Sequence, residues 1–309
     1  MTSQSPMISS SYIGIDVSKA QLDLADASSS KRLPNTKSGV AALLKSLPPR
    51  AHLVLEATGG YERTLVAAAH SARIAISVLN PARVRHFARA TGRLAKTDPI
   101  DAALLRDFGQ ALQPLADPTP HPARTALAQL VHARQQLIDL RTQLSNALEH
   151  LSLPLLRQSF ASQIRSLNTR IVRIDTAIEQ AIAACRELAS LASALCSHPG
   201  VGPQTTAVLL AYLPELGQAN RAQIAALAGL APFNRDSGQS QGPRFTNGGR
   251  PPVRRALYLA ALTTIRSKNS KVGSFYHHLR SNGKPAKVAL IAAARKLLCH
   301  LNSSLKSLH

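Results

Sequence analysis

Four carboxylates in the first third of the chain occur in or beside apolar segments or at a helix start, where an acidic side chain is unfavourable unless it has a specific partner. Asp16 interrupts the apolar run Gly14–Val17, Glu56 ends a second apolar run, and Asp98 and Asp101 open a helical pattern. A carboxylate inside an apolar strand is costly unless a cation or hydrogen-bond donors meet it. Four such groups converging on one point would form an oxygen-donor site suited to Mg²⁺ or Mn²⁺. Such an ion polarises a scissile phosphate and stabilises the attacking and leaving oxygens, so the pattern indicates phosphodiester chemistry.

Each of these acids also has a simpler structural interpretation. Asp98 precedes Pro99 and can be a helix N-cap, with Asp101 favouring the helix dipole. Asp16 can be a turn residue at a strand end, and Glu56 a solvated charge at a sheet edge. The interpretations are compatible, because a capped helix start can still present carboxylates at i and i+3 on one face. Pattern alone leaves the choice open.

A second candidate group is the hydroxyl of Ser237, which directly precedes Gly238. A hydroxyl surrounded by guanidinium groups is placed to attack a phosphodiester, whose developing charge the guanidiniums would offset. The alternative is a loop serine beside phosphate-binding arginines, and Ser240 is a nearby competitor. The candidate nucleic-acid-binding arginines near Ser237 are Arg235, Arg244, Arg250, Arg254 and Arg255.

Gly200 and Gly202 occur in a turn, His198–Pro203, that leads into a helical pattern. Glycines free backbone N–H groups that a phosphate can approach, with the helix dipole behind them. The alternative is a plain glycine turn between two helices.

Alternating strands and helices must position the four acids. Short strands are expected within 12–26, 52–56 and 74–79, and helices within 39–47, 61–71 and 98–110, with a further helix opening at Pro81. This order predicts an α/β domain over residues 12–113, after a disordered tail at 1–11.

The middle and end of the chain are expected to be helical. Four prolines in 114–122 predict a stiff linker. Apolar residues then recur every seven positions, from Leu130 to Leu151 and from Ile164 to Cys185, with a partner series of the second run from Leu167 to Leu195. This recurrence predicts two helices within 114–196. Their seam fits an antiparallel hairpin packed within the chain as well as an oligomerisation arm. Residues 197–309 form a third, helical domain in which Gln239–Pro252 is expected to be a loop.

The charge of the chain indicates a polyanionic partner. It has 37 Lys and Arg against 16 Asp and Glu, and residues 197–309 carry 15 basic and only 2 acidic side chains. Three cysteines without a C-x-x-C pair argue against a disulfide framework and a zinc site. No apolar run is long enough for a signal core or a bilayer span, so we expect a cytoplasmic protein without a membrane partner.

Three stretches resemble the ribonuclease-H-like (RuvC-type) domain of the DEDD insertion-sequence transposases. They are Gly14–Lys19, Glu56–Glu62 and Lys96–Ala102, which match the family's D, E, D, D pattern in order and spacing. Two further stretches, His198–Ala207 and Ala228–Gly238, the latter followed by Gly248–Arg250, resemble the second domain of the same family, with a helix-hairpin-helix-like turn.

The resemblance implies a function for each candidate group. Asp16, Glu56, Asp98 and Asp101 would bind Mg²⁺ (or Mn²⁺), and Ser237 would be the nucleophilic serine that forms a phosphoserine link to DNA. The family consists of bridge-RNA-guided recombinases, so the implied partners are donor and target DNA, a guide RNA, and further copies of the chain in a dimer or tetramer. Such a protein would be bacterial and associated with the nucleoid.

Two other functions fit the residues. One is a metal-dependent Holliday-junction nuclease that uses water as the nucleophile. The other is a non-enzymatic nucleic-acid-binding protein, although a passive binder has no use for carboxylates facing a polyanion. With six Phe, five Tyr and no Trp, base stacking is not expected to supply sequence choice.

Overall fold

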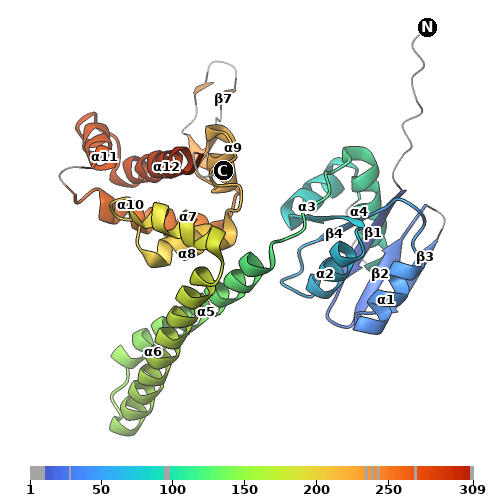
Figure 1. The fold of residues 1–309 in the computed structure, drawn as a ribbon, viewed down its shortest axis with the longest axis horizontal. Helices are drawn as coiled ribbons and strands as arrows, with labels where there is room; N and C mark the ends of the chain where they lie inside the picture. Colours follow the sequence, from blue (N-terminus) through green and yellow to red (C-terminus); the bar gives the residue numbers. More distant parts are fainter. Residues whose placement is uncertain are drawn as a thin grey trace. The chain divides into compact units, whose positions relative to one another are not determined.

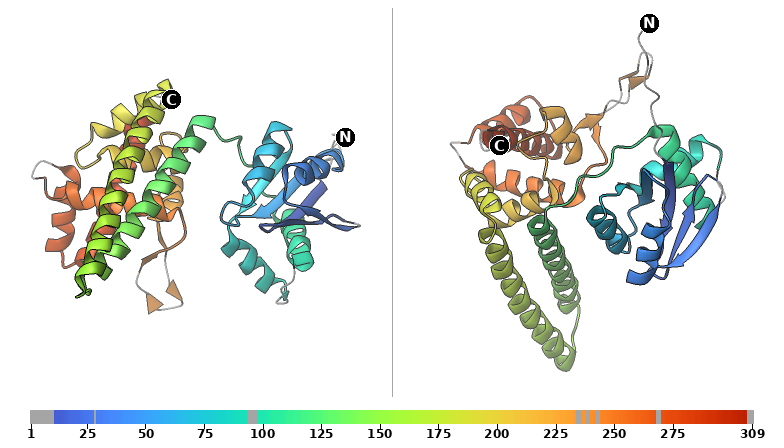
Figure 2. Two further views of the ribbon diagram at one scale, coloured as in Figure 1. Left: turned by 90° about the horizontal axis from the view of Figure 1, so that it is seen from below. Right: turned by 45° about the vertical axis from the view of Figure 1, so that its right-hand side comes forward.

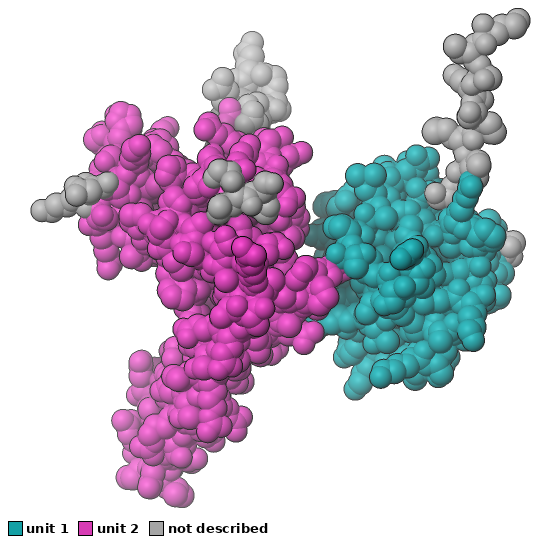
Figure 3. Space-filling view, in the orientation of Figure 1, with its two compact units in different colours: residues 1–119 teal, residues 120–309 magenta. Residues whose placement is uncertain are grey.

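The chain is a mixed α/β protein that divides into two compact units, residues 1–119 and 120–309 (Figure 3). The computed structural model describes residues 11–27, 29–93, 98–233, 236–237, 240–241, 244–267 and 270–306. At 98–99, 236–237 and 240–241 the backbone alone is described. No described helix is both long enough and apolar enough to cross a membrane.

Unit 1 is built on a five-stranded sheet in the order β3-β2-β1-β4-β5 (Figure 1). The strands are β1 (Ser11–Val17), β2 (Gln21–Ala25), β3 (Ser30–Pro34), β4 (Ala51–Glu56) and β5 (Ala75–Leu79). The first three form an antiparallel meander, and β4 and β5 run parallel to β1. Parallel strands need crossover connections, which α1 (Lys37–Lys45) and α2 (Arg63–Ser71) provide.

Helices cover both faces of this sheet. Side chains alternate between the faces of a strand, so Ile13, Ile15 and Val17 point to one side, where they pack with α1 and α2. The other face is covered by α3 (Pro81–Ala90) and α4 (Asp98–Leu112), whose apolar residues pack against Val54 and Leu79. Asp16 and Glu56 have the parity of this second face.

Two glycines let α4 lie directly on the sheet. A Cβ atom on Gly14 would stand 1.9 Å from the carbonyl oxygen of Ala102 and 2.4 Å from the backbone nitrogen of Arg106. A Cβ atom on Gly109 would stand 2.8 Å from the ring of Tyr12. The absence of side chains at these two positions therefore sets the depth at which α4 packs.

The chain after α4 follows the edge of the sheet beside β5. Ser77 donates from its hydroxyl to the carbonyl of Leu115 (2.8 Å), and Asp117 donates its backbone N–H to the carbonyl of Ile76 (2.7 Å). The carboxylate of Asp117 accepts from the N–H of Val78 (2.8 Å). The segment expected as a stiff linker thus begins bound to the sheet.

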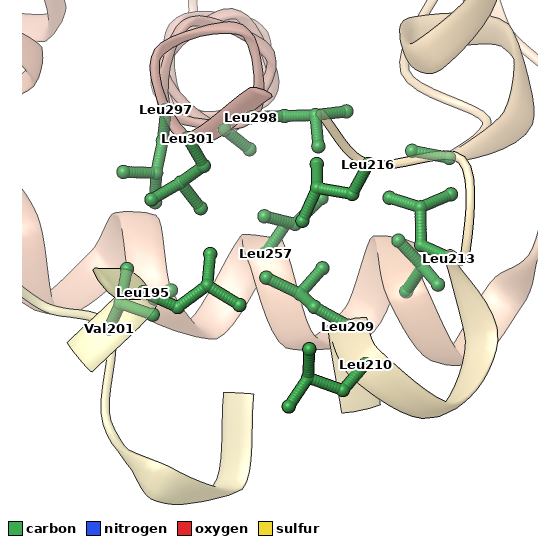
Figure 4. Packing of buried hydrophobic residues seen from close by; sticks show 14 of the residues in the cluster. Leu195, Val201, Leu209, Leu210, Leu213, Leu216, Leu257, Leu297, Leu298 and Leu301 are labelled. Carbon is green, nitrogen blue, oxygen red and sulfur yellow. The ribbon is translucent and has the colours of Figure 1, made fainter. Parts of the chain in front are cut away.

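Unit 2 is predominantly helical. Its helices are α5 (Pro122–Glu149), α6 (Pro154–Ala183), α7 (Arg186–Cys196), α8 (Pro203–Tyr212), α9 (Arg221–Leu227), α10 (Pro251–Thr264), α11 (Lys271–Ser281) and α12 (Ala286–Leu305). Four of them start with proline in the first turn, where its missing N–H leaves no bond unmade. Leucines of α7, α8, α10 and α12 meet in one apolar core (Figure 4).

The two longest helices, α5 and α6, lie side by side as an antiparallel pair joined by a short turn (Figures 1 and 2). Near the core, Leu127, Val131 and Ile178 are buried. Farther out Ile171 is still buried, but Leu140 and Leu155 are 48% and 77% exposed. The pair therefore forms an arm that retains uncovered apolar surface.

The structure corrects three sequence expectations. The segment Gln239–Pro252 is not simply a loop, since it contains β8 (Ser240–Gln241), β9 (Phe245–Thr246) and the start of α10. The second heptad series does not form one helix, because Cys185 is extended and α7 turns Leu188, Leu191 and Leu195 into the core. The polar strand β3 was not predicted, because this exposed edge strand lacks the alternation of apolar and polar residues by which a strand is recognised in a sequence.

Candidate active site

Asp16 and Glu56 are brought together by strand register. In the parallel pair β1–β4, Ile15 lies opposite Leu55, so the next residue on each strand is a carboxylate. Both side chains are partly exposed and have the parity of the face that α3 and α4 cover. Each acid follows an apolar residue of its strand by one position, and the parallel pairing of Ile15 with Leu55 therefore places the two acids side by side.

Asp101 reaches the same place from the first turn of α4. Because Gly14 allows α4 to touch β1 at Ala102, the residue before Ala102 lies beside the end of β1. Asp16, Glu56 and Asp101 all line one cavity of 510 Å³ within unit 1. The structure thus gathers three of the four predicted acids from three different elements. Asp98 is the first residue of α4, and its side chain lies outside the described part.

The donor chemistry of this cavity suits a hard divalent cation, since carboxylate oxygens are the ligands such ions prefer. Among the described side chains, no three His, Cys, Asp or Glu residues are close enough together to hold one ion. Asp98 is not among those side chains. Asp16, Glu56 and Asp101 therefore fit the cation by the type of their donor atoms, while their described positions alone do not form a metal site.

Hydrogen bonds within and between two loops fix the backbone around the acids. After β4, the carboxylate of Glu62 accepts from the hydroxyl of Thr58 (2.8 Å) and from the N–H of Gly60 (2.9 Å). Burial would raise the pKa of Glu62, but hydrogen bonds from its own backbone, from Thr58 and from Gly60 outweigh that effect and hold the pKa below its usual value. Asn35 donates its side-chain amide to the carbonyls of Ser18 (2.8 Å) and Tyr61 (3.1 Å), joining the loop after β1 to the loop after β4.

Sequence reasoning missed three arginines that line the acid cavity, namely Arg85, Arg89 and Arg93. Arg85 and Arg89 are exposed on α3, one helical turn apart, and Arg93 follows the end of that helix and pairs with Asp107. The signal was present, because a spacing of four residues repeats a helix face. Cations around the acids allow a polyanion to approach a negatively charged cavity.

Ser237 lies in a narrow two-stranded ribbon of unit 2. The base of the ribbon is β6 (Pro232–Phe233) paired with β9, and its outer part is β7 (Asp236–Ser237) paired with β8. Ser237 lies opposite Ser240, the competing hydroxyl, and neither side chain is described. Ser237 belongs to a different unit from the acids, so the two parts of the predicted site come from separate bodies.

The predicted arginines of unit 2 have different surroundings. Arg250 donates both terminal nitrogens to the carboxylate of Glu215 (2.6 Å each) and bonds the carbonyl of Tyr212. Burial would raise the pKa of Glu215, but the hydrogen bonds and charge of Arg250 hold it below its usual value. Arg254 bonds the carbonyl of Gly248 (2.7 Å), and Arg255 lies 3.7 Å from Asp139. Arg244 lines a groove described below, and Arg235 lies outside the described residues.

Gly200 and Gly202 differ in their structural constraints. Gly200 has a φ of 82°, and a Cβ atom there would stand 2.1 Å from the hydroxyl oxygen of Thr264, so packing against α10 requires glycine. Gly202 is the N-cap of α8, and a Cβ atom there would meet no other atom within 4 Å. Packing explains the first glycine but not the second.

Comparisons with known proteins give two family matches that together cover most of the chain. Residues 13–160 match the DEDD-type family described as "Transposase", and residues 192–277 match the family described as "Transposase IS116/IS110/IS902 family". The chain is 30% identical to the pilin gene-inverting proteins of Moraxella lacunata and Moraxella bovis, over 94% of this chain and 94% of each relative. It is 33% identical, over 42% of its length and 32% of the relative, to a protein of insertion element IS110 from Streptomyces coelicolor.

Proposed function

The chain belongs to the IS110 family of DEDD transposases, enzymes that recombine DNA, and from this premise we propose that it cuts and rejoins DNA through a covalent bond to Ser237. The observation that carries the phosphodiester chemistry is the cavity of unit 1, where acids from β1, β4 and α4 lie among arginines of α3, and the role of Ser237 is taken from the family resemblance. Carboxylates that face a polyanion are useful for catalysis and unfavourable for simple binding.

Membership of the DEDD domain family indicates dependence on a divalent metal ion in general. We assign Mg²⁺ (or Mn²⁺) to Asp16, Glu56, Asp98 and Asp101. When bound, the ion supplies charge stabilisation at the phosphate oxygens and lowers the pKa of a coordinated hydroxyl. Arg85 and Arg89 bind the neighbouring phosphates, which keeps the strand at the cavity despite the acids.

The serine step is a transesterification. The Oγ atom of Ser237 attacks phosphorus, the bond from phosphorus to the 3′ oxygen breaks, and the serine proton is transferred to that leaving oxygen. The products are a free 3′ hydroxyl and a 5′ phosphoserine ester. A 3′ hydroxyl of another strand reverses the step, so rejoining needs no external energy source.

Ser237 and the acids belong to different units, and we propose that they meet in an assembly of two to four copies. The uncovered apolar side chains of the α5–α6 arm support an assembly role, since exposed large apolar residues on a long helix pair favour association. The functional division we propose is an acid domain at 12–113, a linker and arm at 114–196, and a serine domain at 197–309.

A guide RNA is the partner we propose for sequence choice. The strong positive charge of residues 197–309 supports backbone binding, which carries no sequence information. Base pairing by a bridge RNA to donor and target DNA supplies that information in the proposal.

Inversion of a DNA segment is a second candidate outcome of the same chemistry. The relatives that match over 94% of both chains are named for inverting a pilin gene. Inversion and insertion need the same cutting and rejoining steps and differ in how the recombining sites are arranged on DNA.

The test is incubation of the full chain with element-end DNA, its flanking RNA and Mg²⁺, followed by a denaturing gel. A protein–DNA adduct is expected for the wild type and for Ser240→Ala, and none for Ser237→Ala or Asp16→Asn. Cleavage that survives in Ser237→Ala would establish a nuclease that uses water. Binding without cleavage, unchanged by chelation of the metal, would establish a passive binder.

A further inference from the structure

A second basic surface, distinct from the acid cavity of unit 1, lies on unit 2. It is a groove of 640 Å³ along α12, bounded by α11, the start of α9 and the base of the ribbon that carries Ser237. On α12, Lys287, Ile291, Arg295 and Cys299 recur at four-residue spacing and line this groove. The opposite face of the helix, including Leu290 and Leu297, is buried in the core.

The charge of the groove selects an anionic ligand. Its cationic side chains are Arg221, Arg244, Lys287, Arg295 and Lys296. No acidic side chain lines it among the described residues. The acidic residues within 197–309 are Glu215, which is bound to Arg250, and Asp236, whose side chain lies outside the described part. The described walls of the groove therefore carry cationic side chains and no anionic one.

The apolar lining indicates a ligand that also carries flat, uncharged parts. Phe275 is half-buried on the groove wall, and the Nζ atom of Lys296 lies over its ring, 4.3 Å from the ring centre, in the place that a stacking base would take. Phe245 is 41% exposed and lies 6.0 Å from Phe233, ring centre to ring centre. Val288 is 53% exposed on the groove wall. A simple phosphate site has no use for such a surface, whereas an unpaired base stacks on it.

The groove continues into a second cavity of 480 Å³ on the same unit. The two share Arg221, Lys296 and Cys299, and the second adds Lys271 and His300. We call the joined pair the α12 track. It leads from the ribbon base to His198 and Pro199, at the turn before α8. A site this long takes a chain of linked anionic groups rather than one small anion.

We propose that the α12 track binds a single strand of nucleic acid, with a base against Phe275 and phosphates on Lys287, Arg295 and Lys296. A double helix keeps the faces of its bases stacked inside, so it cannot use an aromatic floor. The proposal that a single strand binds here is argued from the residues of the α12 track alone. Its use, holding an unpaired strand beside the ribbon of Ser237, rests on the function proposed above.

The first experiment uses the fact that the chain contains no tryptophan. In Phe275→Trp the single indole reports on the track, and stacking of a base quenches its fluorescence. A mixed-sequence oligodeoxynucleotide of about 12 nucleotides is titrated without metal. We expect strong quenching by the single strand and much weaker quenching by the same sequence as a duplex. The matched control is Phe160→Trp on the α5–α6 arm, which should respond to neither.

The second experiment measures affinity by fluorescence anisotropy of the labelled oligonucleotide. Phe275→Ala and Lys296→Ala are each expected to weaken single-strand binding about 5- to 100-fold and to change duplex binding by less than about twofold. Arg170→Ala on α6 is the charge-matched control and should leave single-strand binding unchanged. Thermal melting separates loss of the site from loss of the fold.

Three outcomes would overturn the proposal. They are equal quenching by duplex and single strand, unchanged affinity in folded Phe275→Ala and Lys296→Ala, or quenching by an acidic aromatic peptide but not by the oligonucleotide. Because both experiments omit metal and can be repeated in Ser237→Ala, their failure is distinguishable from failure of the proposed chemistry.

Discussion

Replacing Gly14 by alanine tests whether the contact between β1 and α4 positions the acids. The new Cβ atom would stand 1.9 Å from a backbone oxygen of α4, whereas ordinary contacts begin at 3.4 Å. The obstructing atoms are backbone, so no side chain can turn away, and α4 must move by about 1.5 Å. Overpacking of this kind costs about 1–3 kcal/mol. A displacement of about 1 Å at a catalytic group costs on the order of 10²-fold in rate.

Gly14→Ala is therefore expected to lower the midpoint of thermal unfolding of unit 1 by about 5–15 °C and to reduce adduct formation on the order of 10²-fold. Circular dichroism and the denaturing gel measure the two effects. Gly109→Ala is the matched control on the same helix. Its Cβ atom would meet side chains of Tyr12 and Val54 at 2.8 and 2.9 Å, which can give way, so a smaller loss is expected. A folded Gly14→Ala protein with wild-type activity would show that the α4 contact does not set the site.

Three further predictions concern the surroundings of the two candidate sites. Arg89→Ala should reduce adduct formation on the order of 10²-fold in the gel assay, with partial recovery in Arg89→Lys; equal activity of all three proteins would exclude a phosphate-binding role. Asn35→Ala removes two hydrogen bonds between the loops and should cost about 1–3 kcal/mol in urea unfolding, and a change near zero would contradict the loop-joining role. The pKa of Glu215 is lower in the folded protein, so the ionised carboxylate stabilises the fold above pH 4.5, and this stabilisation is lost as the pH falls below that value. In urea unfolding at a series of pH values, Glu215→Gln should lose this pH-dependent part of the stability. The same pH profile in wild type and Glu215→Gln would count against the pairing with Arg250.

The acid cavity shows how far local patterns can lead. Strand alternation places Asp16 on the face opposite Ile15, and a helix start places Asp101 one turn into α4. These are local signals and can be found in the sequence. The convergence depends on strand pairing and on a helix packed without a side chain at Gly14, and only the folded chain supplies those contacts. The family resemblance is confirmed by the comparisons, whereas the function of each acid remains a prediction.

Neither the ribbon of Ser237 nor the α12 track could be predicted from patterns in the sequence. The ladders of the ribbon are two residues long, and the segment is rich in glycine and polar residues, so no alternation marks its strands. The track joins Phe275, Arg221 and Lys296 from three helices. Residues that come together only by tertiary packing show no periodic pattern in the sequence, and a low aromatic content gives no sign of a groove whose lining includes Phe245 and Phe275.

The hydrogen bonds that Ile76 and Val78 make to Asp117 also bear on how copies of the protein avoid harmful association. An uncovered border strand is a template on which another chain can add, leading to swapped or fibrous aggregates. Here the stretch leading out of α4 occupies the free side of β5, and the opposite border, β3, carries the charged Lys31 and Arg32. Protection of both margins of the sheet disfavours polymerisation through strand addition, even at the high local concentrations that crowding on one nucleic acid would create.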